Sequence, residues 1–243
     1  MRNASSPTKM ASRCGGSIFI NFQMSKTIKE RIKKALRITL GVCFILSGVM
    51  KAVNVYSFAQ EIRLYIEAYM DSCFVQWTVE IAVVICAIET ITGLVALSKK
   101  YEPIVAMAFL CMLSFFVWLT GMNLFCPSLM GSIESCGCFG ELIHFSPLSS
   151  FVKSVALWMM SIGYCALCVR GWRRISLKDI LQDSKMYITL VIGTLPPLYS
   201  YLCFEKIEHV WYLAGYIVLC ILEGGMCLKI LMSSSSKKNK EEI

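Results

Sequence analysis

The feature that most constrains this chain is a series of long apolar blocks separated by short charged segments. The hydrocarbon core of a bilayer is about 30 Å thick and a helix rises about 1.5 Å per residue, so each block of about 20 apolar residues predicts a membrane-spanning helix. We predict about six spans, at 36–55, 75–97, 103–125, 150–169, 186–204 and 210–231. The expected fold class is therefore all-α, a polytopic transmembrane helical bundle.

The composition supports a membrane protein rather than a soluble domain. The 243 residues are 56% hydrophobic and 16% charged, whereas soluble domains carry about 25% charged residues. Spans and connections use nearly the whole length, so no sizeable soluble domain is expected. The net charge of +8 does not indicate nucleic-acid binding, because the Lys and Arg residues flank the apolar blocks. At those places they set topology and contact anionic membrane lipid.

The distribution of Lys and Arg predicts the orientation. The N-terminal segment, 98–102, 170–185 and the C-terminal tail are basic, and these alternate with three connections poor in Lys and Arg, at 56–74, 126–149 and 205–209. By the positive-inside rule, both termini are expected in the cytoplasm and the loop 126–149 outside. Within 56–74, apolar residues recur at helical spacing and predict an amphipathic helix on the membrane surface: Phe58, Ile62, Tyr65, Ile66 and Tyr69.

The outer loop contains the pair Cys136 and Cys138, separated by Gly137. One intervening glycine allows the two thiols to close a small disulfide, and a strained disulfide of this kind is labile and suited to exchange. A static structural bond is the alternative. Seven of the 13 cysteines lie within apolar blocks and are interpreted as small apolar fillers, whereas three others near the outer ends of spans can pair with or resolve the loop thiols: Cys73, Cys126 and Cys203.

A metal site is a competing interpretation of the same loop. Cys126, Cys136, Cys138 and His144 are four soft or borderline ligands that can hold zinc or Cu(I). Their spacing matches no standard zinc pattern, so a redox pair is preferred and the metal-handling protein stays an alternative.

Three of the charged residues inside the apolar blocks are of particular interest. Lys51 and Glu80 are each about 6–8 Å from the outer end of their span, so they can pair if the two spans pack together, or extend separately to the interface. Glu89 lies about 21 Å from the outer end. An intramembrane carboxyl is a functional candidate by default and can bind a quinone oxygen or a bundle hydroxyl. Small residues on the same two spans allow close helix approach: Gly41, Gly48 and Gly93.

Several of these pieces together carry a resemblance to a known family. They are the Leu36-Arg37-Ile38 segment, Gly41, Ser47-Gly48-Val49-Met50-Lys51, Phe58, Tyr65, Glu89, Gly93, Leu94 and Cys136-Gly137-Cys138-Phe139-Gly140. Over about 32–170 the chain resembles the MauE branch of the DoxX-like membrane proteins. The resemblance implies a four-helix bundle in the bacterial cytoplasmic membrane and a link to redox and quinone chemistry. MauE itself is implicated in maturing methylamine dehydrogenase, which has a disulfide-rich small subunit.

Carried onto matching positions, the resemblance makes Cys136 and Cys138 the redox pair and makes Lys51 and Glu89 family-pattern residues that are candidates for binding a cofactor. The expected division is a disordered basic N-terminus at 1–31, with Met24 as an alternative start, a four-helix unit at 32–170, a two-helix hairpin at 171–232 and a basic tail at 233–243. The expected function is thiol–disulfide exchange with a periplasmic partner protein, with a quinone as the electron carrier. A non-catalytic assembly protein with a structural disulfide is the alternative from another class.

Overall fold

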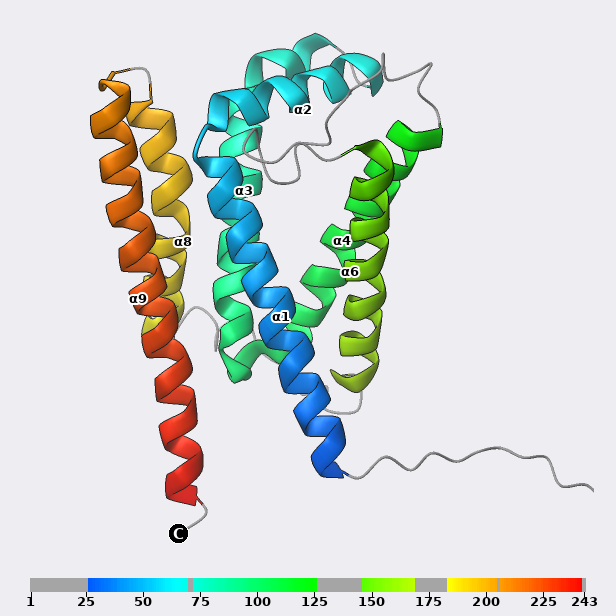
Figure 1. Ribbon diagram of the computed structural model, residues 1–243, viewed down its shortest axis with the longest axis vertical. Coiled ribbons are helices and arrows are strands. Elements are labelled where there is room, and N and C mark those ends of the chain that lie inside the picture. The colour runs from blue at the N-terminus through cyan, green and yellow to red at the C-terminus, as the bar shows by residue number, and fades with distance from the viewer. Residues whose placement is uncertain (1–25, 70–71, 126–145, 169–182, 205, 242–243) are drawn as a thin grey trace, which may run out of the picture.

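The computed structural model describes residues 26–69, 72–125, 146–168, 183–204 and 206–241, and every regular element among them is helical. The elements are α1 (Lys26–Ala52), α2 (Val55–Tyr69), η1 (Ser72–Trp77), α3 (Thr78–Leu97), η2 (Lys99–Tyr101), α4 (Glu102–Phe125), α6 (Pro147–Cys168), α8 (Ser184–Cys203) and α9 (His209–Glu241). The predicted all-α polytopic bundle is confirmed (Figure 1).

Five helices among the described residues are long and apolar enough to cross a bilayer. They are Thr27–Ala52, Cys73–Leu97, Lys99–Phe125, Pro147–Cys168 and Met186–Cys203. The predicted sixth span falls in α9, whose apolar stretch His209–Gly225 is shorter than these five. Large apolar side chains such as Trp118, Val191 and Ile221 are exposed on the outside of the helices. In a multi-pass membrane protein this surface faces lipid.

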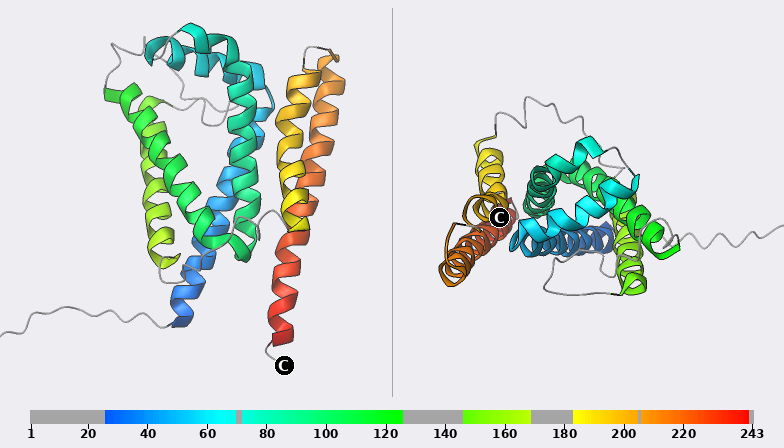
Figure 2. Two further views of the ribbon diagram at one scale, coloured as in Figure 1. Left: turned by 180° about the vertical axis from the view of Figure 1, so that it is seen from behind. Right: turned by 90° about the horizontal axis from the view of Figure 1, so that it is seen from above.

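Four helices form the main bundle, and a hairpin lies beside it. α1 packs against α3, α4 against α6, and α6 against α1, and the contact between α3 and α4 closes the bundle. α8 and α9 form the hairpin, and α8 lies against α3 (Figure 2). In Figure 1 the start of α1 and the end of α9 lie at the same end of the molecule, and α2 lies across the opposite end.

The first helix begins earlier than its hydropathy predicted. α1 starts at Lys26 rather than near residue 36, so residues 26–31 of the expected disordered start are helical. Its first turns carry charged side chains, and Lys33 forms an ion pair with Glu102 at the start of α4 (3.0 Å). Hydropathy marks only the apolar part of a helix, whereas the helix itself extends into its polar flank.

The α1–α3 contact is close because three glycines lie in it. A Cβ on Gly93 would lie 2.7 Å from the carbonyl oxygen of Gly41, and a Cβ on Gly48 would lie 2.9 Å from the carbonyl oxygen of Cys86. Such approach requires small residues, as the sequence predicted. Arg37 then reaches the last turn of α3, where Nη1 donates to the carbonyl oxygens of Ala96 (2.9 Å) and Leu97 (3.0 Å). These carbonyls end the helix and have no partner within it.

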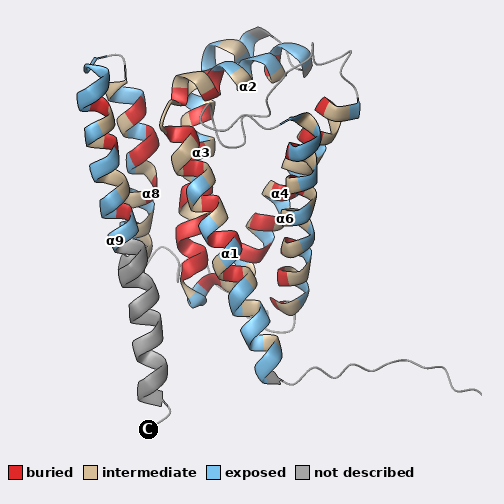
Figure 3. Cartoon of the chain, in the orientation of Figure 1, coloured by how far each residue is buried: buried red, intermediate tan, exposed pale blue. Residues whose placement is uncertain are grey.

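The predicted amphipathic helix is confirmed as α2, whereas its position on the membrane surface stays a prediction. Asn54 caps it, since Asn54 Oδ1 accepts from the backbone N–H of Ser57 (3.1 Å). Phe58 and Ile66 are buried against the bundle, whereas Arg63 and Glu67 are exposed. Figure 3 shows buried residues gathered on the sides of the bundle helices that face one another.

The hairpin is attached to the point where α1 ends. The hydroxyl of Tyr212 donates to the carbonyl oxygen of Val53 (2.6 Å), and that of Tyr216 donates to the carbonyl oxygen of Val49 (2.5 Å). Val49 lies in the last turn of α1, where carbonyls lack intrahelical partners, and Val53 directly follows the helix. The backbone N–H of Val55, at the start of α2, donates to Ser200 Oγ (3.2 Å). The hairpin therefore helps to fix the junction between α1 and α2.

Candidate functional site

The interior of the bundle contains an ion pair between Lys51 and Glu89. Lys51 stands in the last turn of α1 and Glu89 in the middle of α3, and Lys51 Nζ contacts Glu89 Oε1. Lys51 is 2% exposed and Glu89 is 0% exposed. The two residues that the sequence singled out as cofactor-binding candidates are thus brought together by the fold.

The alternative pairing of Lys51 with Glu80 is wrong. Glu80 is exposed in the first turn of α3, and Lys51 pairs with Glu89 instead. The register of the antiparallel helices explains the difference, because Gly48 packs beside Cys86 and Thr90. In this register Lys51 lies nearer to Glu89 than to Glu80, although the predicted span ends placed Lys51 and Glu80 at equal depth.

Aromatic rings surround the ammonium group of Lys51. Lys51 Nζ lies 5.2 Å from the centroid of the Phe58 ring and 4.9 Å from that of Phe116. Rings at this distance attract a cation through their negative faces. Phe58 comes from α2 and Phe116 from α4, so two elements besides α3 meet the Lys51 side chain. The Lys51 ammonium group therefore contacts the Glu89 carboxylate and two aromatic rings.

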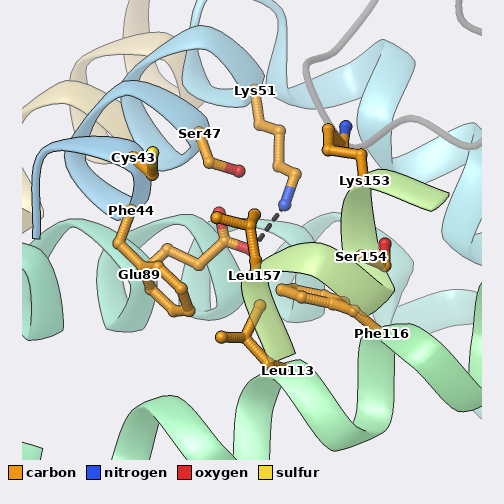
Figure 4. Close-up of a pocket in the computed structure, with 10 residues that line it drawn as sticks. All are labelled: Cys43, Phe44, Ser47, Lys51, Glu89, Leu113, Phe116, Lys153, Ser154 and Leu157. Atoms are coloured by element: carbon orange, nitrogen blue, oxygen red, sulfur yellow. Dashed lines mark hydrogen bonds and ion pairs between the residues drawn. The ribbon is translucent and has the colours of Figure 1, made fainter. Parts of the chain in front are cut away.

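The ion pair lines a cavity of about 140 Å³ between the four bundle helices (Figure 4). One part of the wall is apolar and consists of Phe44, Leu113, Phe116 and Leu157. The other part is polar or carries a thiol and consists of Cys43, Ser47, Lys51, Glu89, Lys153 and Ser154. Cavities that bind small molecules combine an apolar wall with a few convergent polar groups in this way.

One carboxylate oxygen at this cavity is unsatisfied. Glu89 Oε1 accepts from Lys51, whereas Glu89 Oε2 is buried and has no hydrogen-bond partner among the described residues. A buried carboxylate oxygen without a donor is costly, so this atom marks a place where a ligand or water can bind.

Comparison with known proteins assigns the bundle to a family. A family model described as methylamine utilisation protein MauE matches residues 29–172, which is more than half of the chain. The chain belongs to the MauE family. No curated protein and no solved structure matches the chain. The matched range agrees with the resemblance read from the sequence over about 32–170.

The MauE region contains all ten residues that line the cavity, from α1 to α6, whereas α8 and α9 lie beyond it. The loop residues Cys136 and Cys138 also belong to the MauE region, but they lie outside the described residues, as do Cys126 and His144 of the alternative metal site. The described residues contain no group of three or more His, Cys, Asp or Glu side chains that could hold a metal ion.

Sequence reasoning gave no site role to the other polar or thiol-bearing residues at the cavity of this MauE protein, namely Cys43, Ser47, Lys153 and Ser154. The sequence carried a signal for the first two, because Cys43, Ser47 and Lys51 recur every four residues and share one face of a helix. On α6, the buried side chains include Ser150, Ser154 and Ser161. A serine-bearing buried face on an apolar span indicates a polar interior next to it.

Proposed function

We propose that this MauE-family protein is a membrane thiol–disulfide oxidoreductase. In this proposal Cys136 and Cys138 exchange a disulfide with a periplasmic protein during its maturation, and a quinone at the Lys51–Glu89 cavity exchanges electrons with that pair. The membrane is the bacterial cytoplasmic membrane, with the loop 126–149 on its outer side.

The observation that carries the proposal is the buried ion pair beside a ring-sized cavity inside the bundle. An ionised pair within a membrane helix bundle is expensive and marks a functional site by default. Two of the lining residues, Lys153 and Ser154, belong to the first turns of α6. The chain segment that precedes α6 carries the two thiols, with Cys138 nine residues before Pro147.

The chemistry balances with a quinone as the only co-reactant. Oxidation of the Cys136 and Cys138 thiols to one disulfide releases two electrons and two protons, and these convert one quinone to one quinol. Exchange then returns the pair to two thiols while two thiols of the partner become a disulfide. A partner that loses a disulfide drives the same steps in reverse, with quinol as the reductant.

Redox trapping in intact cells tests this function. A thiol-blocking mass tag that cannot cross the membrane is applied before and after a periplasmic oxidant or reductant, to the natural protein and to the Cys136→Ser/Cys138→Ser variant. Cys111→Ser is the matched control, because Cys111 is exposed on α4 away from the cavity lining. We expect the tagged fraction to follow the added reagent, and to depend on the membrane quinone pool, in the natural protein and the control.

Other outcomes contradict the proposal in distinct ways. A pair that stays oxidised under mild reductant is a structural bond, because structural disulfides have potentials below about −300 mV. Thiols that resist the tag until a chelator is added indicate a metal site. Full maturation of the partner protein by the double variant excludes a role for the pair.

A further inference from the structure

The unsatisfied oxygen of Glu89 restricts which ligand the cavity can take. Lys51 Nζ donates to Glu89 Oε1, and Glu89 Oε2 is a buried acceptor with no donor among the described residues. A ligand that fills the cavity without presenting a donor leaves this carboxylate oxygen desolvated and unpaired. A ligand that presents an O–H group removes that cost.

The size and lining of the cavity restrict the ligand further. A volume of about 140 Å³ is close to that of engineered apolar cavities of about 150 Å³, which hold one benzene molecule. Phe44, Leu113, Phe116 and Leu157 supply an apolar wall for the faces of a ring. The polar groups on the rest of the wall come from Ser47, Lys51, Glu89, Lys153 and Ser154 (Figure 4). This lining suits a single aromatic ring with a polar substituent at one edge.

We propose that the cavity binds one aromatic ring bearing a hydroxyl group, and that this hydroxyl donates to Glu89 Oε2. A ring with carbonyl oxygens alone offers only acceptors. It can accept from Lys51 or Lys153, but an oxygen that it places against Oε2 has no proton between them. The preference for a hydroxyl follows from the contacts of Glu89. Interpreting this hydroxyl preference as a preference for a quinol over a quinone rests on the proposed function.

Phenol and anisole are the probes that test this preference, because they share a ring and an oxygen but only phenol carries an O–H. Both are inert toward the cysteines. Purified full-length protein in detergent is titrated with each ring, and affinity is taken from the ligand-dependent rise in melting temperature. Both rings partition into the micelle, so the ratio of the two affinities is compared between variants in the same detergent.

We expect phenol to bind about tenfold more tightly than anisole to the natural protein. In Glu89→Gln an amide N–H can take the place of Oε2 and donate to the ring oxygen, so we expect the ratio to fall to one or below. Leu157→Trp fills the cavity and leaves the ion pair in place, so it is expected to abolish binding of both rings. This second variant keeps the test decisive if Glu89→Gln does not fold.

Equal affinities in the natural protein, or no binding of either ring, overturn the inference and leave a water as the partner of Oε2. A phenol preference that persists in Leu157→Trp places the ring elsewhere and also overturns it. These outcomes are separate from those for the proposed function, since Cys136 and Cys138 can cycle without any phenol preference, and the preference can be present when the two thiols do not cycle.

Discussion

At the scale of single residues, Lys51 and Glu89 depend on each other. Each side chain is almost fully buried, so each has lost its hydration, and the attraction of the opposite charge offsets that loss. Removing one partner leaves the other charge uncompensated in the interior. Replacing both residues with apolar ones leaves no uncompensated charge in the interior.

We predict that Lys51→Met lowers the free energy of unfolding by about 3–5 kcal/mol, and that Lys51→Met/Glu89→Leu regains most of this loss. Thermal unfolding of the full chain in detergent measures both. Arg63→Met is the control, because the Arg63–Glu67 pair (2.7 Å) is exposed on α2 and such surface pairs contribute about 0.3–0.5 kcal/mol. Equal stability of the single and the double variant contradicts the buried pairing.

At the scale of elements, the contact between α1 and α3 decides where Lys51 stands relative to Glu89. Gly41, Gly48 and Gly93 let the backbones of the two helices touch, so the contact fixes their register as well as their distance. The α8–α9 hairpin also binds α1 from outside the bundle, because the Tyr212 and Tyr216 hydroxyls donate to carbonyl oxygens at the end of α1. The site therefore depends on helix packing beyond its own lining.

We predict that Gly93→Ala destabilises the protein by about 1–3 kcal/mol, as overpacking does, and weakens ring binding at the cavity. The added Cβ would lie 2.7 Å from the Gly41 carbonyl oxygen and 2.8 Å from the backbone nitrogen of Ile45, and neither backbone atom can rotate away. Melting temperature and phenol affinity are the measurements. Gly224→Ala is the control, because a Cβ there meets nothing within 4 Å, and unchanged stability of Gly93→Ala contradicts the close packing.

At the scale of the whole molecule, the connections alternate between the two ends of the bundle. The start of α1, the turn at Lys99–Tyr101 and the end of α9 lie at one end, and α2 and the α8–α9 connection lie at the other (Figure 1). This arrangement places the basic segments at Lys99 and at the start of α1 together, as the positive-inside rule requires of cytoplasmic segments. Which end faces the cytoplasm stays a prediction.

We predict that an epitope inserted in the full chain within 126–145 is accessible to antibody on intact spheroplasts, whereas one inserted within 170–182 is accessible only after permeabilisation. The expected orientation follows from the absence of Lys and Arg in the first segment and the cluster of Arg170, Arg173, Arg174 and Lys178 in the second. The reverse pattern of access would place Cys136 and Cys138 in the cytoplasm and remove the basis of the proposed exchange.

The sequence by itself determined the helices, the family and the two charged residues of the site. A span is recognised locally, because bilayer thickness and helical rise set its length whatever its neighbours are. The face of α2 formed by Phe58, Ile62 and Ile66 is also local, since it follows from helical periodicity. Glu89 and Lys51 stood out because charges within apolar blocks are rare.

Only the tertiary structure decided which charge meets which. Depth along separate spans favoured Glu80 as the partner of Lys51, whereas the packed helices bring Lys51 to Glu89. The reason is physical: α1 ends at Ala52, beside the middle of α3, and backbone contact at the glycines sets that register. The cavity likewise exists only where α1, α3, α4 and α6 converge, so its lining could not be read from any one of them.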